Sequence, residues 1–500
     1  MLPIKHDNIT GQCCIIGYNT FNSGSLTSIN IDENNPAYTS EDGILYNKNK
    51  DILIKYPCAK DATSFNIPES VTSIGDRAFY YCKKLSSIII PMSVASIGDS
   101  AFYECRKLSS IILPESLVSL WNNAFCYCSN LSSIIIPNSV TSIRNRAFYS
   151  CNKLSSVILP EGINSIGERA FESCAALTSI KIPKEISSIG QRAFLYCASL
   201  SSIEIQEGIT TIEEYTFSNC GKLVTVNIPN TVSSIGYYAF SDCRSLTEIF
   251  IPDSVATVGY LAFYNCNNLT KIDVNVNNSK YVSENGVLFD KNKDTLIIYP
   301  SAKAEKIYNI PKSVLSISDS AFANCANLEK TNIPEGVVSI GDYAFSNCTN
   351  LSGTIIIPGS VTSMGSEMFF GSGKKVSLIT SKGITTIGRA AFGRFTGLDP
   401  VILPRGLTLI DSSAFEHCSG LTSIVIPAGV IEIMGYAFSG CQLESITIPK
   451  SVASMGADVF GWSIPKSFKI YGFSGSYIEE YAKERNFRFS PLISVLKETL

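Results

Sequence analysis

The sequence predicts a repeat solenoid with one parallel β-strand per coil. Three observations predict it: a fixed period, an apolar pattern that changes within each period, and a proline that closes the strand. Phenylalanine recurs every 23 residues at nine successive positions within residues 79–263, and such a period is typical of coils that stack around one continuous core. Ile88 and Ile90 alternate with Ile89, as in a strand with one buried face. Pro91 then ends the strand because it has no N–H for the ladder.

The rest of each coil is predicted to contain a short helical or 3₁₀ turn. Between Ala78 and Cys82 the apolar positions lie one and three residues apart, which fits such a turn better than a strand. Equivalent strands of successive coils would pair in parallel about 4.8 Å apart. We therefore expect a long sheet on the inner, concave surface and short turns on the outer surface.

Two segments depart from the period and are near copies of each other. NIDENNPAYTSEDGILYNKNKDILIKYP begins at Asn30, and DVNVNNSKYVSENGVLFDKNKDTLIIYP begins at Asp273, an offset of 243 residues. Each contains two strand-like runs joined by a polar turn, which indicates a β-hairpin. We expect hairpin insertions at the edge of the solenoid, near residues 36–60 and 279–303.

The duplication divides the chain into blocks. The predicted divisions are an N-terminal cap (1–25), a first repeat block (26–271), a second repeat block (272–470), and a C-terminal cap with a tail (471–500). The pattern loosens between residues 351 and 404, where we expect a local distortion. Ser476 followed by Glu479 predicts a capping box at the start of a short helix that covers the last coil.

The repeat resembles a known family. The pattern IPxSVxSIGxxAFxxCxxLxSIxIP, found over residues 60–470, is similar to the BspA-like class of leucine-rich repeats of bacterial surface proteins and of some protozoan surface families. The resemblance implies a curved, right-handed horseshoe or arc, often on the cell surface, that binds host, matrix or neighbouring-cell proteins. It implies no enzymatic activity and offers no fixed binding motif. A helical unit commonly ends such arrays.

Composition argues against two classes of partner. The net charge is −3 and the pI is near 5.7, so there is no basic footprint for nucleic acid or anionic lipid. No apolar run approaches the roughly 18 residues needed to cross a membrane. The first 20 residues contain Lys5 as their only cation and do not form a convincing secretion signal. Export by another route, a different start site and a cytoplasmic location all stay open.

Cysteine is the first candidate for chemistry. Thirteen of the 17 cysteines occupy one repeated position, the ladder slot, which includes nine successive coils from Cys82 to Cys266. Buried thiols are favoured over disulfides because side chains in such a ladder point the same way and Phe395 fills the slot in another coil. Metal binding is disfavoured because no CxxC pair occurs and the chain has two histidines. The cysteines outside the ladder are expected to be more reactive: Cys13, Cys14, Cys58 and Cys126.

No catalytic arrangement is predicted. His6 and His417 are far apart in sequence, so a Ser-His or Cys-His pairing is not supported. Asp76, Asp99 and Glu168 recur at one position of the coil, which we interpret as a solvated face. We expect no enzyme, no cofactor and no bound metal.

The outward position of the predicted strand is the candidate binding site. Its residues in successive coils are Ile89, Ile112, Ile135, Ile158, Lys181, Glu204, Asn227 and Phe250. Four adjacent isoleucines rimmed by serines are typical of a protein-binding patch. The alternative is that β-branched residues only stiffen the sheet. A row of tyrosines on the turn side, including Tyr80, Tyr103 and Tyr149, either forms an interface or shields the turns.

Together these features predict a non-enzymatic protein-binding or adhesion protein. We expect it at a cell surface or secreted, with a host, matrix or neighbouring-cell protein as its ligand. The alternative is an intracellular interaction scaffold that uses the same repeat surface.

Overall fold

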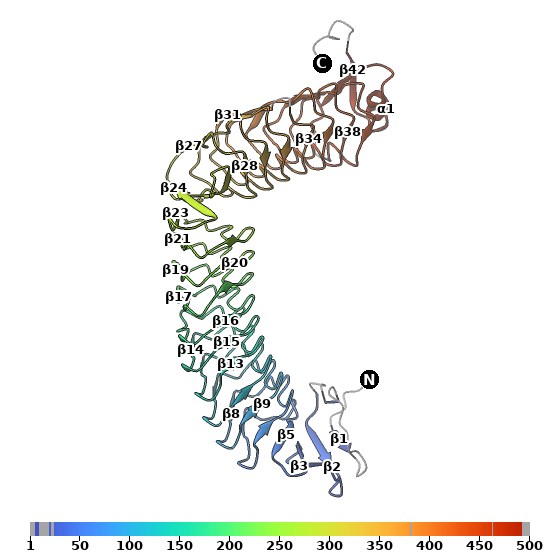
Figure 1. Cartoon of the computed structure of the whole chain (residues 1–500). Coiled ribbons are helices and arrows are strands. Elements are labelled where there is room, and N and C mark those ends of the chain that lie inside the picture. Colours follow the sequence, from blue (N-terminus) through green and yellow to red (C-terminus); the bar gives the residue numbers. More distant parts are fainter. Residues whose placement is uncertain (1–5, 10–19, 22–24, 381–382, 463, 493–500) are drawn as a thin grey trace. The chain divides into compact units, whose positions relative to one another are not determined.

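The structure is a computed structural model of the chain (Figure 1). It describes residues 6–9, 20–21, 25–380, 383–462 and 464–492. Cys13 and Cys14, much of the predicted N-terminal cap and the end of the tail lie outside the described residues. The chain forms two compact units, Met1–Cys266 and Asn267–Leu500. Each unit is a β-solenoid of stacked coils, as the period predicts.

Each regular coil of the first unit has a face segment and an additional two-residue strand, and the face segment forms a strand except in the coil of Lys181, where it makes an isolated bridge. Equivalent strands pair in parallel, so that Ile89 lies opposite Ile112 and Ser96 opposite Ser119. The face strands are β6 (Ser64–Asn66), β8 (Ser87–Ile89), β10 (Ser110–Ile112), β12 (Ser133–Ile135), β14 (Ser156–Ile158), β17 (Ser202–Glu204), β19 (Thr225–Asn227) and β21 (Glu248–Ile251). The two-residue strands are β7 (Ser73–Ile74), β9 (Ser96–Ile97), β11 (Ser119–Leu120), β13 (Ser142–Ile143), β15 (Ser165–Ile166), β16 (Ser188–Ile189), β18 (Thr211–Ile212), β20 (Ser234–Ile235) and β22 (Thr257–Val258).

The core of the first unit contains a stack of phenylalanine rings. From Phe79 to Phe263, successive rings are stacked with centroids 5.0–5.7 Å apart, and all of them are buried. Stacked aromatic pairs add about 0.5–1.5 kcal/mol to the free energy of burial. The 23-residue period is therefore the repeat of one buried ring per coil.

The turn segment differs from the predicted helical or 3₁₀ turn. The N–H of Tyr80 does bond the carbonyl of Arg77, three residues back. The N–H groups of Arg77 and Tyr81, however, bond the carbonyls of Asp99 and Tyr103 in the next coil, at 2.9 and 2.8 Å. Arg77 and Tyr81 also have positive φ values of 54° and 66°, which a right-handed helix does not allow. The segment is a series of tight turns whose alternate N–H groups tie neighbouring coils together.

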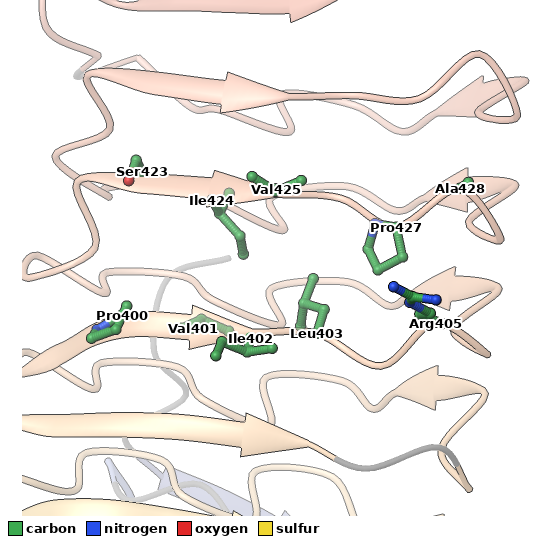
Figure 2. A pocket seen from close by; sticks show the side chains of 10 residues that line it. All are labelled: Pro400, Val401, Ile402, Leu403, Arg405, Ser423, Ile424, Val425, Pro427 and Ala428. Atoms are coloured by element: carbon green, nitrogen blue, oxygen red, sulfur yellow. The ribbon is translucent and has the colours of Figure 1, made fainter. Parts of the chain in front are cut away.

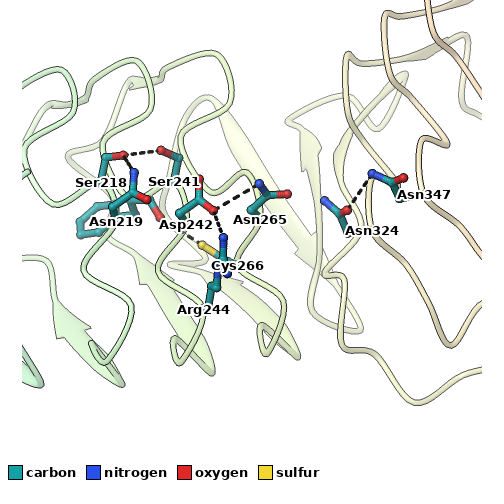
Figure 3. A network of polar contacts seen from close by, with 10 residues as sticks. Ser218, Asn219, Ser241, Asp242, Arg244, Asn265, Cys266, Asn324 and Asn347 are labelled. Atoms are coloured by element: carbon teal, nitrogen blue, oxygen red, sulfur yellow. Dashed lines mark hydrogen bonds and ion pairs between the residues drawn. The ribbon is translucent and has the colours of Figure 1, made fainter. Parts of the chain in front are cut away.

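Short polar side chains suit the left-handed positions of these turns. In the first unit, Asn265 donates from its side-chain amide to Asp242 at 3.3 Å, and in the second unit Asn347 donates to Asn324 at 3.2 Å (Figure 3). All four residues have positive φ, between 56° and 62°. Asn and Asp adopt this conformation more readily than other residues with a side chain.

The ladder cysteines of the first unit are buried, free thiols, and they also donate hydrogen bonds. Cys174 Sγ lies 3.2 Å from the carbonyl oxygen of Phe148, 26 residues earlier. The same contact recurs from Cys105 to Cys266 at 3.1–3.3 Å. The slot therefore holds a small buried side chain that also bonds the preceding coil.

The first insertion contains the predicted hairpin and a third strand. β4 (Ile44–Asn47) pairs antiparallel with β5 (Ile52–Lys55) across the polar turn, and β3 (Tyr38–Glu41) pairs antiparallel with β4. β5 also pairs in parallel with β7, so the insertion extends the ladder of two-residue strands. β1 (His6–Ile9) pairs in parallel with β2 (Ser28–Ile31).

The second unit repeats this plan. After β23 (Lys271–Val274), its insertion consists of β24 (Tyr281–Glu284), β25 (Val287–Asp290) and β26 (Thr295–Ile298). Its face strands are β27 (Ile307–Asn309), β29 (Lys330–Asn332), β31 (Gly353–Ile357), β33 (Val376–Thr380), β35 (Leu398–Ile402), β37 (Ser423–Val425), β39 (Ser445–Thr447) and β41 (Lys469–Gly472). Its two-residue strands are β28 (Ser316–Ile317), β30 (Ser339–Ile340), β32 (Ser363–Met364), β34 (Thr386–Ile387), β36 (Leu409–Ile410), β38 (Glu432–Ile433) and β40 (Ser454–Met455).

The expected distortion lies in strands β31, β33 and β35. Each has five residues, and the register between β33 and β35 shifts between Val376 and Leu378. In the same coils, Ser372 and Phe395 occupy the ladder slot and are buried.

The C-terminal end carries the predicted helix, α1 (Tyr477–Glu484), followed by β42 (Arg488–Pro491), which pairs with β41. The predicted capping box does not form. The hydroxyl of Ser476 donates to the carbonyl of Phe473, and Glu479 accepts from the N–H of Gly475 at 2.7 Å. Residues 473–476 form a tight turn, which presents the Phe473 carbonyl to Ser476 and draws its hydroxyl away from the helix.

Candidate functional site

The apolar half of the predicted site is exposed on the face strands. Ile112 is 84% exposed, and Ile89, Ile135 and Ile158 are 54–61% exposed. Ile89 pairs with Ile112, and Ile135 with Ile158. They point outward because strand side chains alternate, and the preceding residue, such as Ile111, is buried. We call these four isoleucines the first stripe.

The other half of the predicted site is polar until its last residue. Glu204 pairs with Asn227, and Phe250 is 46% exposed. Lys181 lies in a coil whose face segment makes only an isolated bridge. Its ammonium is 2.6 Å from the carboxylate of Glu161, and this hydrogen bond raises the pKa of Lys181. Both groups are exposed, so the ion pair contributes little to stability.

The serines beside the first stripe come in pairs, and the first serine of each pair bonds the preceding coil. Ser109 and Ser132 donate from their hydroxyls to carbonyls of the preceding coil, at 3.4 and 3.2 Å. Ser86 and Ser155 make the same contact, at 3.0 and 3.1 Å. These serines therefore help to hold the coils together. The second serine of each pair is exposed: Ser87, Ser110, Ser133 and Ser156.

A second stripe, which we did not predict, lies on the face of the second unit. Ile356, Ile402 and Val425 are 52–55% exposed, and Ile379 between them is half-buried. Ile356 pairs with Ile379, and Ile379 with Ile402. The extra residue before Ile356 interrupts the count from Phe345. Ile89 and Ile356 both stand two residues before a proline, so counting back from the proline would have found most of this stripe.

A shallow groove crosses the second stripe between β35 and β37 (Figure 2). Its volume is about 440 Å³, and its lining includes Ile402, Leu403 and Val425, with Arg405 at one end. It lies where one sheet, β31-β33-β35, ends and another, β37-β39-β41-β42, begins. The side chains that line the groove are apolar apart from those of Ser423 and Arg405.

The tyrosines of the turn side pack on one another. The ring centroids of Tyr80 and Tyr103 are 4.8 Å apart, and those of Tyr127 and Tyr149 are 5.2 Å apart. Burial raises the pKa of Tyr80 and of Tyr127. Tyr196 is 50% exposed. Mutual packing, face to face for Tyr80 with Tyr103 and edge to face for Tyr127 with Tyr149, favours the shielding role for these four. A role in an interface stays a prediction.

The described residues show no arrangement for metal-dependent chemistry, since no group of three or more His, Cys, Asp or Glu side chains among them could hold a metal ion. His417 Nε2 lies 3.9 Å from a carboxylate oxygen of Glu416 on an exposed turn. Within the described part of the chain, no helix has the length and apolar character needed to cross a bilayer.

The prediction of reactive cysteines outside the ladder is wrong for Cys126. This thiol is buried, and burial raises its pKa to about 12, which keeps it protonated and unreactive. Cys58 is also buried, but its pKa is lowered, first by a hydrogen bond from Cys82. The pKa values of these two thiols are therefore shifted in opposite directions.

Comparison with known proteins places the repeat in a family. The family described as "BspA type Leucine rich repeat region (6 copies)" matches residues 56–178, 164–292, 300–421, 353–466 and 408–488. A search of curated proteins gave no match.

Among solved structures, the chain is similar to three bacterial leucine-rich repeat proteins. One is a leucine rich cell surface protein from Faecalibacterium prausnitzii A2-165, with 25% identity, coverage of 89% of this chain and 97% of that chain, and a TM-score of 0.46. The second, from Eubacterium ventriosum ATCC 27560, has 27% identity, coverage of 67% and 84%, and a TM-score of 0.47. The third, from Bacteroides ovatus ATCC 8483, has 25% identity, coverage of 91% and 98%, and a TM-score of 0.41.

The family matches span residues 56–292 and 300–488, which is most of the chain. The strand, the buried phenylalanine and the cysteine slot recur through both units with the period of that repeat. The chain therefore belongs to the BspA-type leucine-rich repeat family.

Proposed function

We propose that the chain is a non-enzymatic binding or adhesion protein, exposed on a cell surface or secreted, that contacts a partner protein through its face strands. The observation that carries the proposal is the first stripe, in which four isoleucines in equivalent positions are each more than half exposed. Covering such side chains is worth about 25 cal/mol per Å² of apolar area. An exposed apolar row of this kind is typical of a protein-binding patch.

Two further features support a protein as the ligand. The exposed serines beside the stripe, such as Ser87 and Ser110, can form hydrogen bonds with backbone or side-chain groups of a partner. An apolar centre with a polar rim is the usual anatomy of a protein interface. Repeat solenoids also commonly bind proteins along an extended surface of this kind.

The test compares the intact chain with variants of the stripe. Ile112→Lys combined with Ile135→Lys places two charges in the centre of the first stripe. The unaltered chain is first used to capture proteins from host or neighbouring-cell extract. We expect the affinity of the variant for these proteins to be lower by at least about tenfold. Circular dichroism should stay native, because both side chains are exposed.

A matched control is Val118→Lys, which charges an apolar side chain that is 60% exposed outside the face strands. It should capture the same proteins as the unaltered chain. Equal capture by the stripe variant, or equal loss in the control, would refute the proposed surface.

The location of the protein is tested by treating intact producing cells with a protease. A chain that stays fully protected from the protease would instead be an intracellular scaffold.

A further inference from the structure

Two thiols meet where the first insertion joins the first regular coil. Cys58 follows β5, and Cys82 begins the cysteine ladder. Cys82 donates its S–H to the sulfur of Cys58, with the two Sγ atoms 3.1 Å apart. Cys58 donates to the carbonyl oxygen of Tyr80 at 2.7 Å. Because an S–S bond is about 2.05 Å long, the sulfurs need to approach by only about 1 Å to be joined.

This contact differs from those of the cysteine ladder. Cys105 Sγ has a carbonyl acceptor at 3.2 Å, whereas the corresponding carbonyl for Cys82, that of Tyr56, is 3.9 Å away. Cys58 precedes Cys82 by 24 residues rather than by the 23 of the ladder, so the ladder position in its coil is Ala59. Cys58 thus approaches Cys82 from outside the row of parallel side chains.

The two thiols are not equivalent. Cys58 is 7% exposed and Cys82 is 1% exposed, so solvent reaches Cys58 more easily. The hydrogen bond from Cys82 lowers the pKa of Cys58, burial opposes the shift, and the positive charge of Lys55 lowers the pKa further. Burial raises the pKa of Cys82. Cys58 is therefore the thiol that ionises first, and it gives up its bond to Tyr80 when it does so.

Lys55 is a buried cation beside the pair. Its side chain is 4% exposed, and its ammonium donates to the carbonyl of Arg77 at 2.8 Å. It also lies 5.8 Å from the centre of the Tyr80 ring. Besides Lys55 and Cys82, the titratable groups among the described residues that interact with Cys58 include Tyr56 and Cys105. Lys55 is thus the cation that favours the thiolate of Cys58.

The duplicated insertion shows that the fold does not require this arrangement. At the offset of 243 residues, Ser301 stands for Cys58, Ile298 for Lys55 and Cys325 for Cys82. The backbone is the same: the N–H groups of the tyrosines before the two prolines bond the equivalent carbonyls of the next coil, both at 2.8 Å. The first insertion therefore carries a thiol and a lysine that the near copy lacks while keeping the same backbone contact.

We propose that Cys58 and Cys82 form a redox-active dithiol that a peroxide converts into a disulfide. The Cys58 thiolate attacks one peroxide oxygen, the O–O bond breaks, and the leaving hydroxide takes up a proton. The sulfur of Cys82 then attacks the resulting sulfenic acid, so that an S–S bond forms and the S–O bond breaks with loss of water. Two electrons pass from the thiols to the peroxide. The disulfide ties the insertion to the first regular coil.

The direct test uses the intact chain. The folded protein is treated with hydrogen peroxide, free thiols are alkylated, and unreduced peptides are mapped by mass spectrometry. We expect a linked Cys58–Cys82 peptide, lighter by two hydrogen atoms and reversed by dithiothreitol, before any link such as Cys325–Cys348. Recovery of Cys58 only as free thiol or as an unlinked oxidised acid would overturn the proposal. Links formed equally fast between ladder cysteines would also overturn it.

Variants separate the roles of the residues. In Cys82→Ser, Cys58 should accumulate as a sulfenic acid that a dimedone probe traps, with no link. Ser301→Cys combined with Ile298→Lys should create a second peroxide-dependent link, to Cys325, and its absence would contradict the geometric argument. Lys55→Met should shift the pH dependence of Cys58 oxidation to higher pH. An unchanged pH dependence would show that Lys55 is not the cation that favours the Cys58 thiolate.

Discussion

The cores of the two units differ in regularity although their coils are alike. In the first unit cysteine fills the ladder slot in nine successive coils, whereas in the second Ser372 and Phe395 take that slot in two coils. Ser372 donates to the carbonyl of Phe345 at 2.6 Å, which is the contact that cysteine makes elsewhere. Phe395 fills the space above Gly373, where a Cβ would lie 1.9 Å from its ring. The slot therefore needs a donor or a filled volume, not sulfur itself.

The face strands follow a different rule. The second stripe spans the two coils in which the cysteine ladder is interrupted and one coil on either side of them. The position equivalent to Ile89 in the duplicate is Asn332, so the second stripe begins one coil later relative to its insertion. Because the two stripes begin at different distances from their insertions, the stripe is not a by-product of the repeat. Core and face are set by separate constraints.

The largest expected effect tests whether the two cores are equally tight. Phe148→Ala and Phe392→Ala each remove a fully buried ring stacked between two others, at 5.6 and 5.4 Å in the first case and 5.7 and 5.3 Å in the second. Each should lower the free energy of unfolding by about 3–5 kcal/mol, measured by chemical denaturation. A much smaller loss for Phe392→Ala would show that the second core is looser.

A smaller effect is expected when the second core is made to resemble the first. Phe395→Cys restores the ladder residue but leaves a cavity above Gly373, because no Cβ from that residue can fill it. The variant should lose about 2–4 kcal/mol in chemical denaturation. Phe395→Leu, which keeps most of the volume, should lose less. An unchanged stability of Phe395→Cys would mean that the coil relaxes to the geometry of the first unit.

Much of this fold could be predicted because each element has a local pattern. The strand, the insertions and the terminal helix are visible as alternation, as a polar turn between apolar runs, and as helical spacing. The turns could not be assigned, because the spacing of Ala78 and Cys82 suits both a 3₁₀ turn and tight turns with left-handed residues. In this coil the left-handed positions are occupied by Arg77 and Tyr81, whereas Gly371 and Gly440 take the position equivalent to Tyr81 in two coils of the second unit. The hydrogen bonds of Arg77 and Tyr81 run between coils, which a linear pattern does not display.

The two candidate sites also differ in whether a local sequence pattern predicts them. The first stripe follows from alternation within a strand, so its exposure could be predicted from the position of Ile89. The contact of Cys58 with Cys82 could not, because it depends on how the end of an insertion meets the next coil. The residues gave one signal, namely that Cys58 lies outside the ladder. Cys126 gave the same signal and is an inert buried thiol, so the position in sequence alone does not separate the two.

The smallest expected change in stability tests whether the residue in the ladder slot acts as a hydrogen-bond donor in both units. Cys174→Ser keeps a donor toward the Phe148 carbonyl, whereas Cys174→Ala removes it at nearly equal volume. If the thiol donates a hydrogen bond, the serine variant should be the more stable by about 0.5–1.5 kcal/mol. If it acts only as a small apolar side chain, alanine should be the better replacement, because a buried hydroxyl without a partner is costly.

Ser372→Ala provides the counterpart in the second unit. Its hydroxyl donates to Phe345 and accepts from the N–H of Cys348 at 2.9 Å. Alanine should therefore cost about 1–3 kcal/mol, more than the difference between the two Cys174 variants, because it also leaves a buried N–H unpaired. Ser372→Cys, with a longer and weaker donor, should fall between serine and alanine in denaturant unfolding. The reverse order would show that the two units fill the same slot for different physical reasons.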